Sequence, residues 1–241
     1  MNPIGKETKM YRMLYEIDRH GIMTAQQLFS RIKTSRSNIG RGVKKLEKLG
    51  FIKVSKVYRE YCYYITNEGS HYIGRINFGY TQTDKEPNTT TLRHNLKLVD
   101  ATAMSLAKLK KEVPTKNLEL ITEREHLAWW YERLEQQFTG KFLRQEKNGL
   151  RKKVPDYLIR YMDDDGELMT LAYELELTRK STNYLLKKLK WYSDQVDRFD
   201  RYQNLIYVCE EKRIYVNVAY NAEKIGLSVG YQIFEPLEGE K

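Results

Sequence analysis

Two strand-like apolar runs joined by an acidic turn constrain the fold of this chain more than any other feature. The turn reads Asp-Asp-Asp-Gly at residues 163–166, and its Asp-Gly pair is typical of a tight β-hairpin. Opposed residues in an antiparallel hairpin have position numbers with a constant sum, so this turn places Asp156 opposite Glu174. Glu176 lies two residues further along and points to the same side. The pattern therefore predicts three carboxylates on one face of a sheet.

The alternate positions of the second strand are apolar and suit a buried core: Leu171, Tyr173, Leu175 and Leu177. Carboxylates held close together raise one another's pKa unless a cation neutralises them. An acidic face beside an apolar face is thus a candidate functional site.

The positive charge of the chain is concentrated in its first third. Residues 1–76 hold 15 Lys and Arg against 6 Asp and Glu, a net charge of +9. Residues 77–241 hold 27 against 26, a net charge of +1. This asymmetry favours a polyanionic partner for the N-terminal segment, most simply nucleic acid.

Other classes of protein fit the composition poorly. The sequence contains no run of 18 apolar residues and no apolar leader near its start, so we expect a cytoplasmic protein with no membrane partner. Cys62 and Cys209 each lie in a strand-like apolar run, and we expect both to be buried free thiols.

The first third has the pattern of a winged helix-turn-helix. Apolar residues at helical spacing predict a helix over residues 6–20, a short second helix capped by Thr24, and a third helix that Thr34 or Ser35 caps and Gly50 ends. Two strand-like segments and a closing helix over residues 67–76 follow. We expect residues 1–76 to form one DNA-binding domain.

The outward face of the third helix carries the candidate DNA contacts. Its residues 44–52 resemble the end of the recognition helix and the start of the wing in many bacterial winged-helix proteins. Recognition helices usually touch base edges near their first turns, while further basic residues neutralise phosphates. A solvated basic helix on a protein-binding winged helix is the alternative. The residues expected to contact double-stranded DNA are Arg36, Ser37, Asn38, Arg41, Lys44 and Lys48, with Lys56 and Arg59 near the wing tip.

Residues 77–91 are polar and aperiodic, as in a linker, and residues 92–241 predict a second domain. Helical spacing marks residues 92–113, 123–138 and 181–199, the last with Lys187, Lys188 and Lys190 on its outer side. Besides the hairpin, strands are expected at residues 118–122, 142–146, 204–209, 214–219 and 227–234, with a turn at residues 148–149. This order predicts an α+β or α/β domain with a mixed sheet covered by helices.

Asp156 after Pro155, followed by Glu174 and Glu176 across a hairpin, resembles the core of PD-(D/E)xK nucleases. The resemblance implies that these three carboxylates hold Mg²⁺, which would activate water and stabilise the leaving phosphate. Glu176 stands where that motif has its lysine, and Lys180 is the nearest substitute along the chain. An active nuclease and an inactive nuclease-like fold therefore both remain open.

A longer set of motifs resembles the plasmid replication-relaxation proteins. They are the winged helix, a helix opening near His94, Thr-Glu-Arg-Glu at 122–125, Val-Pro-Asp at 154–156, and Glu-Leu-Glu-Leu-Thr-Arg-Lys-Ser at 174–181. Such proteins occur on plasmids and integrative elements, beside replication or mobilisation genes.

This resemblance implies a DNA-binding accessory or initiator that works with a relaxase or replication protein. A Mg²⁺-dependent nicking or cleaving endonuclease is the alternative, with Asp156, Glu174, Glu176 and Lys180 as its catalytic residues. A winged-helix transcription regulator is a further alternative. The oligomeric state stays open and is compatible with a dimer.

Overall fold

The computed structural model describes residues 4–6, 8–57, 60–74, 89–113, 116–151, 153–199 and 201–235. The chain divides into two compact units, Met1–Val99 and Asp100–Lys241. The division falls inside one long helix, α5 (Thr89–Glu112). Both units combine helices with a sheet, so the structure is mixed α+β, as the sequence predicted.

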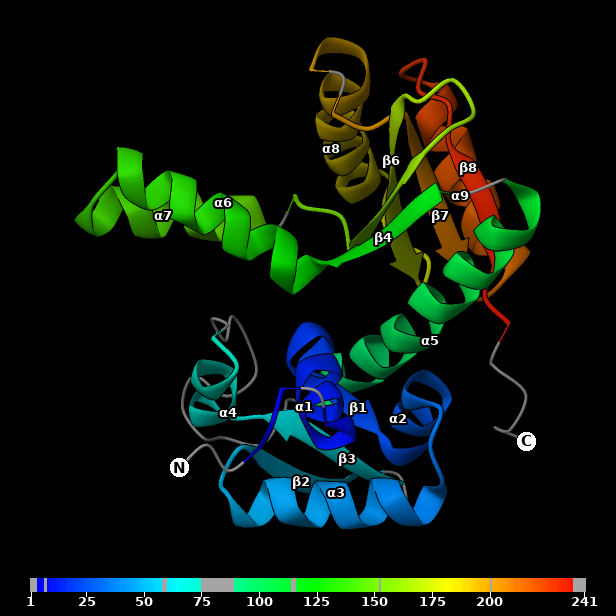
Figure 1. Cartoon of the computed structure of the whole chain (residues 1–241). Coiled ribbons are helices and arrows are strands. Elements are labelled where there is room, and N and C mark those ends of the chain that lie inside the picture. The colour runs from blue at the N-terminus through cyan, green and yellow to red at the C-terminus, as the bar shows by residue number, and fades with distance from the viewer. Residues whose placement is uncertain are drawn as a thin grey trace. The chain divides into compact units, whose positions relative to one another are not determined.

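The first unit packs short helices around a small antiparallel sheet with the strand order β1-β3-β2 (Figure 1). Helix α3 lies along the outer edge of this unit in the same view. The elements before α5 are α1 (Lys9–His20), β1 (Ile22–Thr24), α2 (Ala25–Ile32), α3 (Arg36–Lys48), β2 (Ile52–Val57), β3 (Glu60–Ile65) and α4 (Asn67–Tyr72).

Side-chain caps fix where these helices begin. The hydroxyls of Thr8, Thr24 and Ser35 accept hydrogen bonds from backbone N–H groups of the first turns of α1, α2 and α3. Gly21 ends α1 with a φ of 79°, a value that glycine adopts without strain. The predicted apolar stripes of the helices then meet in one core, with Leu14, Ile17, Leu28, Ile39, Val43 and Leu46 all buried.

The second unit is built on a five-stranded mixed sheet with the order β4-β5-β6-β7-β8. Strands β4, β5 and β6 pair antiparallel, whereas β7 and β8 run parallel to β6. After α5 the elements are β4 (Lys116–Thr122), α6 (Glu123–Gln137), α7 (Gly140–Arg151), β5 (Tyr157–Met162), β6 (Leu168–Glu176), α8 (Thr182–Ser193) with the π-helical extension η1 (Asp194–Arg198), β7 (Asn204–Cys209), α9 (Lys212–Glu223) and β8 (Gly230–Ile233).

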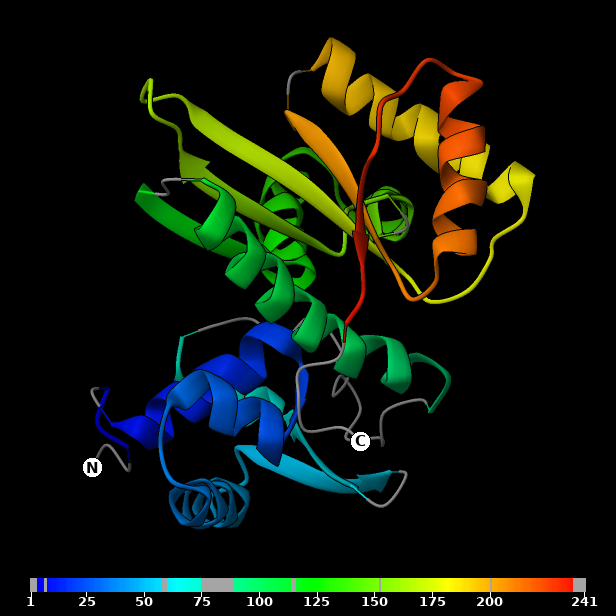
Figure 2. The same cartoon turned by 90° about the vertical axis from the view of Figure 1, so that its right-hand side faces the viewer.

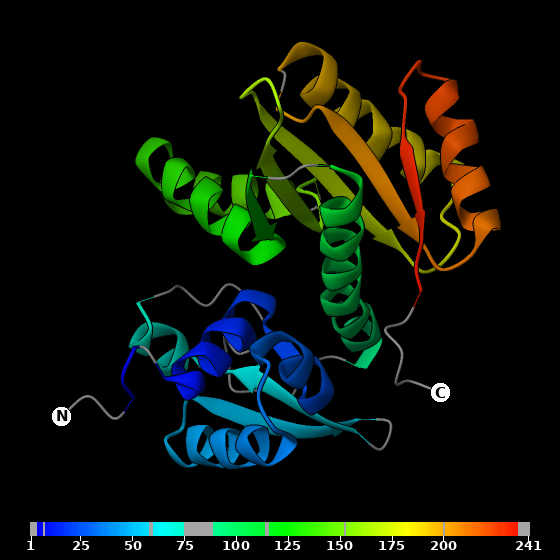
Figure 3. The same cartoon turned by 45° about the vertical axis from the view of Figure 1, so that its right-hand side comes forward.

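Helices cover both faces of this sheet. Figures 2 and 3 show α8 and α9 together on one face and α5 on the other. On the first face, Leu158 and Ala172 pack with Leu185, Leu189, Ile214 and Val218. On the other face, the Tyr157 hydroxyl lies 2.8 Å from Ser105 Oγ of α5. Strand β6 is therefore buried on both sides, including its acidic side.

Two predicted strands and one predicted turn are wrong. Residues 142–146 and 148–149 lie inside α7, which packs against α6 where Lys147 pairs with Glu135 and lies 4.8 Å from the Tyr131 ring centroid. Residues 214–219 lie inside α9, whose buried residues Ile214, Val218, Asn221 and Ala222 recur at helical spacing. The β-branched residues of this segment indicated a strand, but packing against the sheet overrides that preference.

Two further predictions concern membrane-spanning helices and the two cysteines. Within the described residues, no helix is long and apolar enough to cross a membrane. Cys62 and Cys209 are free and buried, as predicted. Burial raises the pKa of Cys62 to about 11 and that of Cys209 to about 12, so both thiols stay protonated at neutral pH.

Candidate functional site

The first candidate site is the outward face of α3. Ile39, Val43 and Leu46 are buried in the core and define the inward face of α3. Because residues three and four apart share a helix face, the remaining positions project outward together. Arg36, Ser37, Arg41, Lys44 and Lys48 are exposed and Asn38 is half-buried. Ser37, Arg41, Lys44 and Lys48 thus share the outward face of α3, with Arg36 and Asn38 in the first turn on either side of it.

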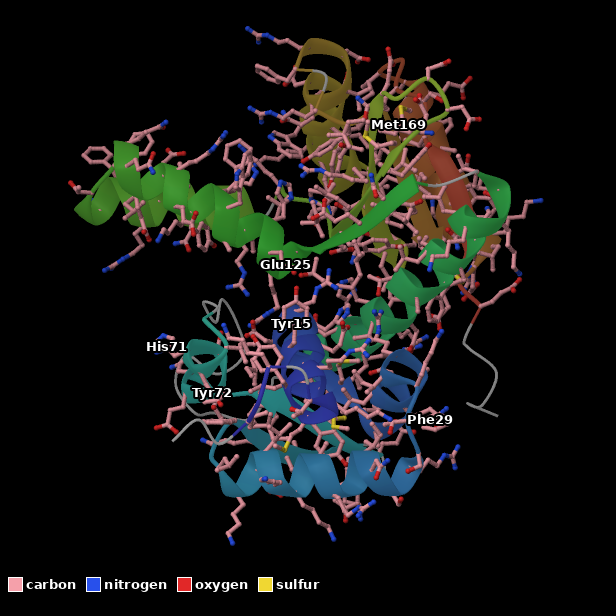
Figure 4. All side chains as sticks on the ribbon, in the orientation of Figure 1. Tyr15, Phe29, His71, Tyr72, Glu125 and Met169 are labelled. Carbon is pink, nitrogen blue, oxygen red and sulfur yellow. The ribbon has the colours of Figure 1, made fainter. Side chains whose placement is uncertain are left out.

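The cations on this surface lack acidic partners. Arg36 donates to Gln26 Oε1 at 3.2 Å and lies 5.6 Å from the ring centroid of Phe29, which is labelled in Figure 4. Arg41 donates to Asn38 Oδ1 at 2.6 Å. Among the described residues, no carboxylate oxygen lies within 4.0 Å of a side-chain nitrogen of Arg36, Arg41, Lys44 or Lys48. These groups are charged and free to meet an anion.

Two basic residues of α1 and α2 differ from those on α3. Arg19 and Arg31 both approach the Glu16 carboxylate, at 3.9 and 3.6 Å. Positive charge on α1 and α2 is therefore partly neutralised within the unit, whereas that on α3 is not.

The strand pair next to α3 adds one more predicted cation. Lys56, on β2, is exposed and lies 5.9 Å from the ring centroid of Tyr61 on β3. Arg59, also predicted to contact DNA, lies outside the described residues.

The second candidate site is the acidic end of β5 and β6. Tyr157 pairs with Tyr173, so the position numbers of opposed residues in β5 and β6 sum to 330. The same sum, continued one residue beyond the start of β5, puts Asp156 opposite Glu174. Asp156 Oδ2 accepts a hydrogen bond of 2.7 Å from the backbone N–H of Leu175. Glu174 and Glu176 are 1% and 5% exposed. Lys180 Nζ lies 3.6 Å from Glu176 Oε2.

Sequence reasoning missed the lysine that contacts Glu174. Lys188 donates to Glu174 Oε2 and Tyr192 donates to Glu174 Oε1, both from α8. Lys188 was expected on the outer side of this helix, but its side chain is only 14% exposed. The sequence did contain a pattern that places Lys188 inward, because positions 185, 188, 189 and 192 follow the spacing of one buried helix face.

Burial has the largest single effect on the pKa values of Glu174 and Lys188. It raises the pKa of Glu174, and Asp156 adds to this rise, while the Lys188 ammonium and the Tyr192 hydroxyl oppose it by stabilising the carboxylate. Burial alone would lower the pKa of Lys188, but the carboxylates of Glu174 and Asp156 hold that pKa above its ordinary value. The Lys188 ammonium is therefore the stable positive charge at this end of the sheet.

The carboxylates do not form a ready metal site. Among the described residues, no three His, Cys, Asp or Glu side chains converge so that they could hold a metal ion. Both oxygens of Glu174 and one of Asp156 already accept hydrogen bonds from the protein.

The structure thus combines a small helical unit that presents unneutralised basic residues with a mixed-sheet unit that buries an acidic cluster. The chain belongs to the replication-relaxation family, whose model matches residues 14–208. Membership implies a role related to plasmid replication. No curated protein and no solved structure matches the chain significantly.

Proposed function

We propose that this chain is a DNA-binding protein of a plasmid or other mobile element, acting in replication or mobilisation as an accessory or initiator. Residues 1–76 would serve as a winged helix-turn-helix, with α3 as its recognition helix and β2 and β3 as its wing. The second unit would be a nuclease-like PD-(D/E)xK domain that does not cleave DNA and contacts a relaxase or replication protein.

One observation carries the proposal: the cations of α3 are exposed and unpaired, while Arg19 and Arg31 in the same unit approach an acid. A row of unneutralised cations on one helix face suits the phosphates that line a DNA groove. The net charge of residues 1–76 is +9, out of +10 for the whole chain, which agrees with this assignment.

The order of residues along α3 suggests a division of labour. Arg36, Ser37 and Asn38 lie in the first turn, which enters the major groove most deeply in helix-turn-helix proteins. Asn38 and Arg36 carry the amide and guanidinium groups that read adenine and guanine edges. Arg41, Lys44 and Lys48 follow along the helix and would bind phosphates, as would Lys56 beside it.

A charge-reversal experiment tests the DNA interface. The double variant Arg41→Glu/Lys44→Glu should lose at least about 100-fold in affinity for duplex DNA in a mobility-shift assay, because two attractive phosphate contacts become repulsive. The matched control is Lys187→Glu/Lys190→Glu, which changes the net charge equally at two exposed positions of α8. Equal losses in both variants, or no loss in the first, would remove α3 from the interface.

A Mg²⁺-dependent endonuclease is the second candidate. The observation that favours it is the register of β5 and β6, which aligns Asp156 with Glu174 and brings Glu176 to the same end of the sheet. Supercoiled plasmid incubated with the protein and Mg²⁺ or Mn²⁺ separates the two candidates. Nicked or linear product that disappears in Asp156→Ala and Glu174→Ala supports cleavage, whereas binding without product supports the non-catalytic role.

A further inference from the structure

A buried acidic cluster in a protein needs a source of positive charge. Asp156, Glu174 and Glu176 lie at the same end of two paired strands, and the two glutamates are almost fully buried. In a metal-dependent nuclease a divalent cation would neutralise such carboxylates. Here the described residues contain a different cation at that place.

Helix α8 positions the Lys188 ammonium on Glu174. Ser181, five residues after the end of β6, caps the helix through its hydroxyl and fixes the start of α8 at Thr182. Leu185 and Leu189 are buried against the sheet and anchor the helix face on which Lys188 also lies. One turn further on, Tyr192 donates to the second oxygen of Glu174. The same helix therefore satisfies both carboxylate oxygens.

The ammonium and a divalent metal ion compete for the same position. A metal ion that used Glu174 would have to approach an oxygen that Lys188 or Tyr192 already holds, and it would be repelled by a charge at hydrogen-bonding distance. Asp156 is engaged too, through the Leu175 N–H.

We propose that Lys188 is a built-in cation that takes the place of a divalent metal ion at the carboxylates of Glu174 and Asp156, while Lys180 lies 3.6 Å from Glu176 Oε2. The second unit then keeps its acidic cluster as a metal-independent ion-pair core. This inference does not rest on DNA binding by α3, since it concerns other residues and a different ligand.

Mn²⁺ is the probe that tests this inference, because its electron paramagnetic resonance signal distinguishes free from bound ions. The full-length protein should bind no Mn²⁺ that depends on Glu174. Lys188→Met removes the ammonium at similar volume and should create one Mn²⁺ site at least tenfold tighter than any in the parent protein. The double variant Lys188→Met/Glu174→Gln should lose that site, and Lys187→Met, at an exposed position of α8, should not create one.

Two results would overturn the inference. One is an Mn²⁺ ion bound to the parent protein and lost in Glu174→Gln. The other is a folded Lys188→Met variant, judged by circular dichroism, that gains no site. If Lys188→Met does not fold, the comparison of the parent protein with Glu174→Gln decides alone. Mn²⁺ held equally by both, for example on the acidic turn at residues 163–166, supports the inference.

Discussion

Glu174 shows how single contacts decide the meaning of an acidic motif. Its place opposite Asp156 follows from turn position and strand pairing alone, and the structure has that register. What neutralises it depends on which face of α8 turns inward, a property of the helix docked on the sheet. Lys188 interrupts a face otherwise made of Leu185, Leu189 and Tyr192. A lone charge on such a face is better interpreted as the partner of a buried acid than as part of a solvated surface.

A second prediction concerns His126 and the pH dependence of stability. It is buried on α6, accepts a 2.9 Å hydrogen bond from Trp130 Nε1, and has its pKa lowered to about 4 by burial and by the nearby Arg160 and Arg201. The unfolded chain protonates this imidazole near pH 6.5, whereas the folded chain does not. Stability conferred by neutral His126 is thus present above pH 6.5 and is lost as the pH falls toward 4.

We expect the second unit to lose about 3 kcal/mol of unfolding free energy between pH 7 and pH 4 through this residue. His126→Gln, which keeps an acceptor for the indole N–H, should remove that part of the loss. Urea unfolding followed by tryptophan fluorescence measures it, because all three tryptophans lie in the second unit. Identical pH profiles for the two proteins would refute this origin of the acid sensitivity.

At the scale of elements, local signals predicted the structure well and tertiary packing explains the misses. Thr24 and Ser35 cap their helices as expected, and the Asp-Gly turn joins β5 to β6. Residues 142–146 and 214–219 were taken as strands from short apolar stretches, where helix and strand patterns are hard to distinguish. The π-helical end of α8 has no signal in the sequence, and Phe199, which follows it, is 48% exposed.

A substitution at Gly69 tests how α4 packs within the first unit. A Cβ at this position would lie 2.1 Å from the carbonyl oxygen of Phe51, which also accepts the Thr66 N–H. Gly69→Ala should therefore destabilise the first unit by about 2 kcal/mol, since backbone atoms would have to move. Gly40→Ala is the matched control: its Cβ meets nothing within 4 Å, so a helical alanine should stabilise slightly.

Native-state thiol labelling measures the effect of Gly69→Ala on the first unit alone. Cys62 is buried in the first unit and Cys209 in the second, so the ratio of their labelling rates isolates the change. Cys62 should react about thirtyfold faster in Gly69→Ala, with Cys209 unchanged. An unchanged ratio would show that α4 is not packed as described.

At the scale of the whole molecule, charge separates the two units by role. The basic excess lies in the part of the chain that carries α3, while the second unit is close to neutral and pairs Glu174 and Glu176 with lysines of its own. Family membership supplies the setting of plasmid replication. The proposed division assigns attachment to DNA to the first unit and contact with a relaxase or replication protein to the second.

The salt dependence of duplex binding shows most directly whether the chain binds DNA through α3. We predict that log Kobs falls linearly with log[NaCl], and that Arg41→Ala makes the slope shallower by about one, the value of a lost phosphate contact, while Lys187→Ala leaves it unchanged. An affinity that does not vary with salt, or identical slopes and affinities for the parent protein and Arg41→Ala, would contradict DNA binding through α3.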